Sequence, residues 1–186
     1  MQPLTCKSFA KLNLCLHILD KRKDGYHNLE SIFCIIDFYD MLSFQKNNST
    51  KVNFKTNSNE IDFSHNLVTK AYDVLSNLYD IEGVDIFLDK KIPIGSGLGG
   101  GSSNAAVTLL ALNNIFNLNI SKDKLMKISE DIGADAPFFI NGGTARIGGK
   151  GEIIDNISID QKYFVLVLTN LNISTKDIYE SLSPKE

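Results

Sequence analysis

The sequence has 186 residues, of which 43% are hydrophobic and 22% charged, a balance typical of folded globular chains that excludes intrinsic disorder. Its formal net charge of −3 gives no overall basic field, which argues against a dedicated nucleic-acid binder. The cysteines form no C-x-x-C pair, the histidines have no metal-ligand spacing, and no stretch reaches the roughly 18 apolar residues of a membrane span. We therefore expect a cytoplasmic protein with reduced thiols, no structural metal and no membrane segment.

The N-terminal part is predicted to form strands. Residues 11–19 alternate, which indicates a half-buried strand with leucines toward the core and Lys11 on the polar face, directed away from the core. After a connection at 20–25, residues 32–44 read as a second strand that pairs back antiparallel with the first. Residues 51–56 are predicted to form a further short strand.

The middle of the chain shows helical and extended patterns in turn. Apolar residues at helical spacing predict a helix over 68–78, for which Ser64 or Asn66 is the N-cap. Alternation over 84–88 predicts a strand, and an apolar stripe after the following glycine-rich loop predicts a helix from about Ser102 to Asn114.

The C-terminal part is predicted to contain two helices and several short strands. One helix begins after the N-cap Ser121 and ends at Gly133. Short strands are expected at 138–140, 144–147 and 163–168, and a capping pattern at Ser174 opens a final helix. No internal repeat or linker divides the chain, so we expect one α+β domain with a mixed sheet and helices.

A glycine-rich loop lies between the predicted strand 84–88 and the predicted helix after it. Five glycines between residues 95 and 101 allow positive φ and a close approach of backbone to ligand, and a helix start adds free N–H groups. Phosphate is the ligand that suits such a loop. Ser102 and Ser103 offer hydroxyls that could cap the helix, bond phosphate or help to hold Mg²⁺. The alternative is that the glycines only make a tight turn.

Two familiar phosphate motifs do not explain this loop. Gly95, Gly97 and Gly100 satisfy G-x-G-x-x-G, but a second helix follows where a dinucleotide-binding unit needs a parallel strand. No lysine follows the glycines as the Walker motif requires.

The loop resembles that of a known superfamily. Lys90-Lys91-Ile92-Pro93 running into Gly97-Leu98-Gly99-Gly100-Gly101-Ser102-Ser103 is similar to the phosphate loop of the GHMP kinases. Two further segments, Ala10-Lys11-Leu12-Asn13-Leu14 with Asp24-Gly25-Tyr26-His27-Asn28-Leu29, and Gly133-Ala134-Asp135-Ala136-Pro137-Phe138-Phe139, resemble the branch that acts on 4-diphosphocytidyl-2-C-methyl-D-erythritol.

This resemblance implies a fold and an activity. The fold is the GHMP kinase N-terminal domain, a ribosomal-protein-like arrangement of two layers, over residues 1–170. Residues 171–186 would begin the connection to a C-terminal domain that this chain lacks. The activity is ATP-dependent phosphorylation of the 2-hydroxyl group of that substrate, in non-mevalonate isoprenoid precursor synthesis, with Mg²⁺.

The resemblance also assigns the catalytic aspartate to Asp135, which would accept the hydroxyl proton; a purely structural carboxylate is the alternative. Lys11 can pair with Asp135 and keep it ionised, or act on the substrate, although a solvated surface lysine is the ordinary reading of such a residue. The implied ATP-binding residues are Asn66, Lys90, Pro93, Gly95, Gly97, Leu98, Gly99, Gly100, Gly101, Ser102 and Ser103, with Asn66 and Lys90 at the adenine and Ser102 as a weak candidate for a Mg²⁺ ligand.

Substrate-binding residues follow from the same resemblance. Asn13 shares the face of Lys11 and can hydrogen bond the substrate. His27 can bond the pyrimidine edge, and Tyr26 with Tyr179 could stack on the cytosine, although Tyr179 could equally be a core residue. Thr175 is a weaker substrate contact.

Other functions remain as alternatives. They are another GHMP kinase acting on mevalonate or a related alcohol, a nucleotide-binding fragment without turnover, and an RNA-binding module suggested only by fold analogy. We expect a small-molecule partner, no nucleic acid or membrane, and a monomer or homodimer.

Overall fold

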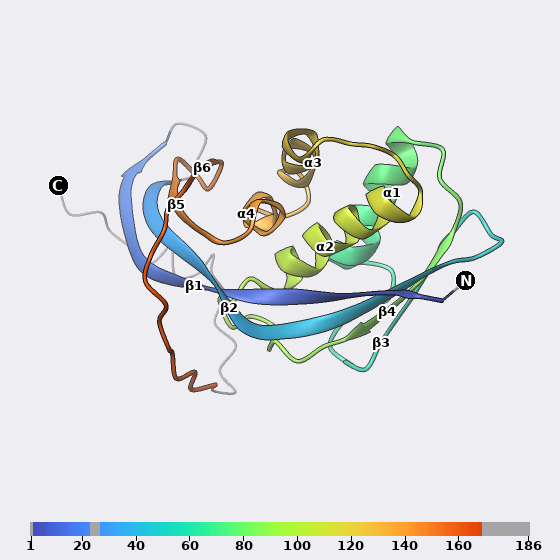
Figure 1. Ribbon diagram of the computed structural model, residues 1–186, viewed down its shortest axis with the longest axis horizontal. Coiled ribbons are helices and arrows are strands. Elements are labelled where there is room, and N and C mark those ends of the chain that lie inside the picture. Colours follow the sequence, from blue (N-terminus) through green and yellow to red (C-terminus); the bar gives the residue numbers. More distant parts are fainter. Residues whose placement is uncertain (1, 23–26, 169–186) are drawn as a thin grey trace.

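A mixed sheet covered by helices on one face forms the described part of the chain (Figure 1). The structure is a computed structural model and describes residues 2–22 and 27–168. Its strands are β1 (Leu4–Lys21), β2 (His27–Lys46), β3 (Val52–Thr56), β4 (Val84–Asp89), β5 (Thr144–Gly148) and β6 (Ile153–Asn156). Its helices are α1 (Leu67–Leu78), α2 (Gly100–Ile115), α3 (Lys122–Ser129) and α4 (Ala136–Asn141). The predicted α+β class and mixed sheet are confirmed.

The long strand β2 organises the sheet. One of its edges pairs antiparallel with β1, as predicted for the first two strands. Its other edge is shared, because residues 41–46 pair with β4 and residues 31–34 pair with β5. β3 adds parallel to β4, and β6 adds antiparallel to β5. The sheet therefore divides along this edge of β2 into one branch with β4 and β3 and another with β5 and β6.

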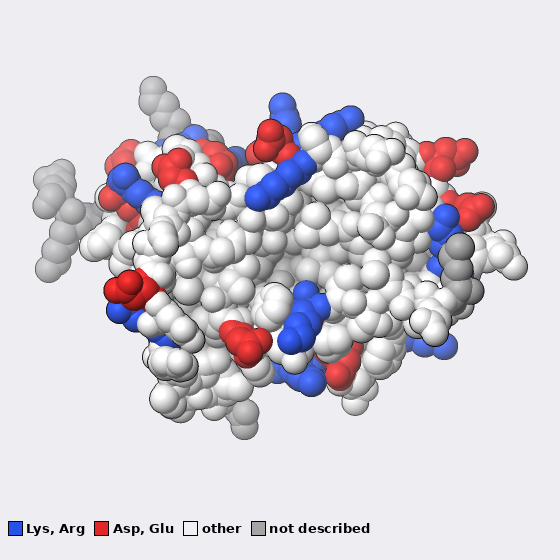
Figure 2. Space-filling view, viewed as in Figure 1, with Lys and Arg blue, Asp and Glu red and all other residues white. Residues whose placement is uncertain are grey.

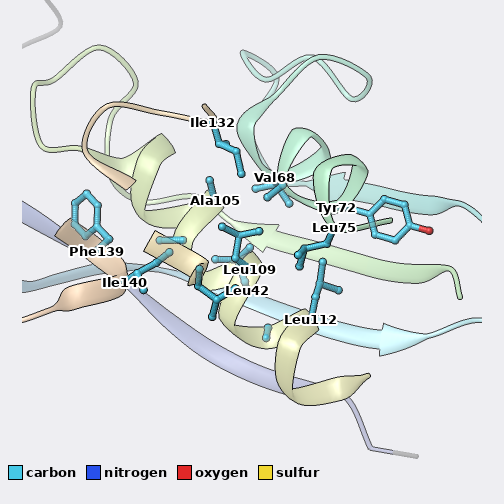
Figure 3. Packing of buried hydrophobic residues seen from close by; sticks show 14 of the residues in the cluster. Leu42, Val68, Tyr72, Leu75, Ala105, Leu109, Leu112, Ile132, Phe139 and Ile140 are labelled. Carbon is cyan, nitrogen blue, oxygen red and sulfur yellow. The ribbon is translucent and has the colours of Figure 1, made fainter. Parts of the chain in front are cut away.

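The hydrophobic core lies between the sheet and the helices. Leu75 of α1, Leu109 and Leu112 of α2 and Leu42 of β2 are fully buried and converge in this layer (Figure 3). Burying one such side chain completely stabilises the fold by about 1.5–3 kcal/mol. Apolar residues at helical spacing in α1 and α2 supply one side of the core, which is what the sequence pattern predicted.

Two helices differ from prediction at one end. α2 begins at Gly100, two residues earlier than expected, with Gly99 as its N-cap and no side-chain cap, so neither Ser102 nor Ser103 caps it. α3 has the predicted N-cap Ser121 but ends at Ser129, where the N–H of the C-cap Glu130 bonds to the Lys127 carbonyl three residues back in a tightened turn. In α1, Asn66 rather than Ser64 is the N-cap.

The prediction for the C-terminal half was wrong or incomplete in three respects. Residues 138–140 lie in the short helix α4, which Pro137 starts, and not in a strand. Residues 163–168 form no strand, since none of the described residues pairs with them; Val165, for example, is 92% exposed. β6 was not predicted.

The direction of Lys11 was also predicted wrongly. Its side chain is buried, whereas Leu14 and Leu16 on the same strand are exposed. Alternation assigned two faces to the strand, but packing of the helices and loops decides which face is covered.

Candidate active site

A large cleft of about 1520 Å³ opens where β1, the loop between β4 and α2, the start of α1 and the turn before α4 meet. Every described residue assigned to the site from sequence lines it except Ser103. They are Lys11, Asn13, His27, Asn66, Lys90, Pro93, Gly95, Gly97, Leu98, Gly99, Gly100, Gly101, Ser102 and Asp135. Tyr26, Thr175 and Tyr179 lie outside the described residues. The fold thus brings segments from distant parts of the sequence together around one space.

The glycine loop has the backbone geometry of an anion site. Gly95, Gly97 and Gly99 all have positive φ, of 69°, 73° and 72°, a conformation that residues with a side chain rarely adopt. The loop leads directly into α2, whose N-terminus has no side-chain cap. The N–H groups of its first turn are therefore available to a ligand, and the helix dipole favours a negative charge there. A phosphate group matches this arrangement.

The loop is also packed closely against the protein. A Cβ atom on Gly99 would lie 2.8 Å from the ring of Phe139, and one on Gly100 would lie 2.9 Å from Ile92 Cγ2. The Lys11 N–H donates to the Leu98 carbonyl at 2.9 Å, which ties β1 to the loop. Side chains at these two glycines would displace the backbone that forms the site.

Lys11 and Asp135 face each other across the cleft floor. Lys11 Nζ lies 3.6 Å from Asp135 Oδ2, and the side chain of Lys11 is only 7% exposed whereas that of Asp135 is 30% exposed. The ammonium group also donates to Asn13 Oδ1 and lies 4.5 Å from the centre of the Phe33 ring. The carboxylate is therefore paired on one side and open to the cleft on the other.

The turn before α4 places Asp135 beside the glycine loop. Asp135 is the N-cap residue of α4 but its side chain makes no capping bond, so its oxygens remain free for other partners. Gly133 allows the close approach, because a Cβ atom there would lie 2.9 Å from Ser102 Oγ at the start of α2. A glycine two residues before the aspartate thus brings the carboxylate close to the glycine loop.

Burial lowers the pKa of Lys11 from its ordinary value of 10.5, and the nearby Asp135 only partly opposes this shift. A lowered pKa means that the ammonium form is disfavoured in the folded protein. The unfolded chain then binds more protons than the folded one between the lowered pKa and 10.5, so stability rises with pH across that window. The charged Lys11 therefore lowers the free energy of unfolding at neutral pH.

Replacing Lys11 with methionine should make the protein more stable at pH 7, by about 1 kcal/mol, because the desolvation of the ammonium outweighs its attraction to Asp135, and the Asp135 side chain, 30% exposed, is hydrated once Lys11 is removed. The gain should shrink as the pH approaches 10.5, where the wild type loses the unfavourable charge. Urea unfolding at pH 7 and pH 10 measures both effects. This account would be contradicted if the variant were less stable than the wild type at pH 7 and the difference in their free energies of unfolding did not change with pH.

Three residues assigned to ATP or metal binding have partners within the protein. Ser103 is buried, and its hydroxyl accepts from Ser8 Oγ at 2.8 Å, so it points away from the cleft. Asn66 lines the cleft, but its side chain caps α1 by accepting from the Val68 and Thr69 N–H groups. Lys90 pairs with the buried Asp40 at 2.6 Å.

The cleft includes residues that the sequence did not single out. Leu16 and Leu29 line the part formed by the β1–β2 hairpin, and Lys150 and Gly151 line it from the turn between β5 and β6. This turn lies beside the hairpin because the Leu29 N–H donates to the Gly149 carbonyl at 2.7 Å. A glycine pair such as Gly148-Gly149 is typical of a turn, but nothing local indicated where the turn would lie.

The chain is similar in sequence and in fold to known kinases. Residues 66–143 match the family described as the GHMP kinases N-terminal domain. Over these residues the chain is similar to the GHMP kinases, and its described part has the fold of their N-terminal domain. A mevalonate kinase from Methanococcus jannaschii, 18% identical, has the same fold with a TM-score of 0.66 over 86% of this chain and 57% of that one.

Within the superfamily, the chain is similar to proteins named 4-diphosphocytidyl-2-C-methyl-D-erythritol kinase. The protein from Francisella philomiragia is 44% identical over 177 residues, which are 94% of this chain and 64% of the relative. That from Thermoanaerobacter sp. strain X514 is 41% identical over 97% of this chain and 62% of the relative. A crystal structure of 4-(cytidine 5'-diphospho)-2C-methyl-D-erythritol kinase is 31% identical and superposes with a TM-score of 0.79. The match covers 97% of this chain and 65% of that one. The resemblance is confirmed, and the chain spans less than two thirds of these relatives.

Proposed function

We propose that this chain supplies the ATP-binding and catalytic part of a kinase that phosphorylates the 2-hydroxyl group of 4-diphosphocytidyl-2-C-methyl-D-erythritol, in isoprenoid precursor synthesis. The observation that carries the proposal is the Lys11–Asp135 pair in the same cleft as an anion-binding glycine loop. Phosphoryl transfer needs those two elements, a site that positions the phosphates and a group that receives the hydroxyl proton. The names of the relatives supply the substrate.

In this proposal Asp135 is the general base. Its carboxylate accepts the proton of the attacking hydroxyl as the bond to the γ-phosphorus forms. The Lys11 ammonium beside it favours the ionised carboxylate and can also orient the hydroxyl. Asn13, which accepts a hydrogen bond from Lys11, fixes the direction of that ammonium.

The glycine loop binds the triphosphate of ATP in this proposal, with backbone N–H groups of Gly100, Gly101 and Ser102 as donors. Mg²⁺ would neutralise phosphate charge. The described residues contain no group of three or more His, Cys, Asp or Glu side chains that could hold a metal. In this proposal the ion would be held mainly by phosphate oxygens, with the Ser102 hydroxyl as the protein ligand.

The substrate lies toward the β1–β2 hairpin in this proposal. His27 lines the cleft there and bonds the cytosine edge, while Asn13 contacts the group next to the hydroxyl. Tyr26 and Tyr179 as stacking partners and Thr175 as a further contact stay predictions. So do the division at residue 170 and the monomeric or dimeric state.

We also propose a cytoplasmic location, since Cys6, Cys15 and Cys34 are all free thiols. Separately, none of the described helices is long and apolar enough to cross a membrane. On the face shown in Figure 2, acidic and basic side chains are interspersed around an uncharged centre, unlike the basic surface of an RNA-binding protein.

One alternative keeps the anion site but not the reaction. In it, the glycine loop binds nucleotide without turnover. Calorimetric binding of ATP or CMP with no product formed would support this nucleotide-binding fragment.

The proposed activity predicts that ADP formation from ATP depends on the cytidyl substrate, and that free CMP inhibits it by competing for the cytosine site. The measurement is a coupled ADP assay with the cytidyl substrate, with mevalonate, and with ATP alone. ADP formation that does not need the cytidyl substrate would contradict the substrate assignment. Turnover with mevalonate that CMP does not inhibit would favour another GHMP kinase.

A further inference from the structure

Asp40 of β2 is a charged residue buried beneath the glycine loop. Its side chain is fully buried. Oδ1 accepts from the backbone N–H groups of Lys91 at 2.7 Å and Ile92 at 2.8 Å. Oδ2 accepts from Lys90 Nζ at 2.6 Å and from Asn104 Nδ2 at 2.9 Å. Four donors therefore converge on one carboxylate.

These donors come from both ends of the glycine loop. Residues 90–92 lead into it, and Asn104 follows it in the first turns of α2. Asn104 Nδ2 also donates to Ser8 Oγ at 2.9 Å, and Ser8 Oγ donates to Ser103 Oγ at 2.8 Å. The network thus joins β1, β2 and α2 and holds the two ends of residues 93–102 at fixed positions.

Stability alone is a weak reason for such a network. Removing a carboxylate and an ammonium from water is costly, and apolar residues of similar volume often serve a fold equally well. Burial in fact lowers the pKa of Lys90 despite its bonds to Asp40, so its charged form is held at a cost. What apolar residues could not supply is an acceptor for two specific backbone N–H groups beside the loop.

We propose that Asp40 is a positioning residue of the nucleotide site, which fixes the glycine loop from both ends so that its N–H groups keep the arrangement that a triphosphate needs. The proposal rests on the proposed function in that it takes ATP as the ligand of the loop. Asp40 itself contacts neither ATP nor the cytidyl substrate, since it does not line the cleft.

The test compares three variants of the chain with the wild type. Asp40→Ala removes both acceptor oxygens, whereas Asp40→Asn keeps one oxygen for the Lys91 and Ile92 N–H groups. Val84→Ala is the control, because Val84 is fully buried at the opposite end of β4 and its truncation destabilises the core without touching the loop. Amide hydrogen exchange over residues 91–102 and calorimetric binding of ATP and of CMP are measured for each.

We expect Asp40→Ala to raise exchange over residues 91–102 and to weaken ATP binding by at least about tenfold, with CMP binding changed by less than about threefold. Asp40→Asn should show smaller changes of the same kind, and it keeps the test valid if the alanine variant does not fold. Val84→Ala should leave loop exchange and ATP affinity unchanged.

Two results would overturn the proposal. One is loop exchange in Asp40→Asn and Asp40→Ala that equals that of the wild type. The other is an equal loss of ATP and CMP binding in the Asp40 variants and in Val84→Ala, which would mark a merely structural role. The two proposals can fail separately. If the wild type binds no ATP, the proposed function fails. If amide exchange over residues 91–102 still rises in the Asp40 variants, the role of Asp40 in fixing the loop is supported.

Discussion

Asparagine in place of Asp135 should lower turnover by a factor of about 10² to 10⁴, the usual contribution of a general base. The amide has nearly the shape of the carboxylate but cannot accept the proton of the attacking hydroxyl. ATP affinity should change by less than about threefold, because the N–H groups proposed to bind phosphate belong to the loop and α2. The measurements are kcat with the cytidyl substrate and calorimetric binding of ATP.

Asp131→Asn is the matched control for this variant. Asp131 is an exposed residue four positions earlier in the chain. Its backbone carbonyl accepts a hydrogen bond from Lys70, and this bond does not involve its carboxylate. The same change of charge and shape there should leave kcat unaltered. Full turnover in Asp135→Asn would remove Asp135 from the mechanism.

Valine in place of Gly100 should weaken ATP binding by at least about tenfold, and turnover at low ATP should fall in parallel. A Cβ atom at this position would lie 2.9 Å from both Ile92 Cγ2 and Lys90 Nζ. Lys90 cannot simply move aside, because it is bonded to the buried Asp40. The first turn of α2 must therefore shift, and its N–H groups move with it. Calorimetric titration with ATP measures the loss.

Gly148→Ala is the control, because Gly148 lies in β5 and does not line the cleft. A Cβ atom there would lie 3.5 Å from Ile153 Cβ, which is an ordinary contact, so ATP affinity should be close to that of the wild type. If Gly100→Val also bound ATP normally, the assignment of the triphosphate to this loop would be wrong.

Local sequence signals predicted the position of the glycine loop and most of the elements around it. Dense glycine between an alternating segment and a helical stripe is a strong local pattern, and the loop lies between β4 and α2 as expected. Ser121 was recognisable as an N-cap, and Asn66 as one of two candidates with Ser64, because such side chains bond to backbone groups two or three residues away. Short-range chemistry of this kind can be read without knowledge of the fold.

Short apolar runs were harder to interpret. Phe138, Phe139 and Ile140 suit either a buried strand or a buried helix, and periodicity cannot separate the two over three residues. Pro137, at the first turn of α4, was the signal that favoured a helix. Residues 163–168 show the opposite case, in which an alternating apolar segment has strand propensity but finds no partner among the described residues. Strand formation depends on a neighbour, which a local pattern does not contain.

Tertiary packing determined the features that the sequence could not show. The burial of Lys11 depends on the approach of Leu98 and on the turn that carries Asp135. Asp40 was not singled out, because its four donors come from residues 50 to 64 positions later in the chain. Partners so far apart in sequence leave no periodic signal. The site was therefore recognisable as a set of residues, while its internal support was not.

The position of β2 links the site to folding cooperativity. This one strand carries Asp40 beneath the loop, places Phe33 against Lys11, and pairs with β1, β4 and β5. Local opening that freed β2 would separate both halves of the sheet at once. The cleft is thus built on the strand that joins the sheet together, so we expect its geometry to persist until the sheet itself opens.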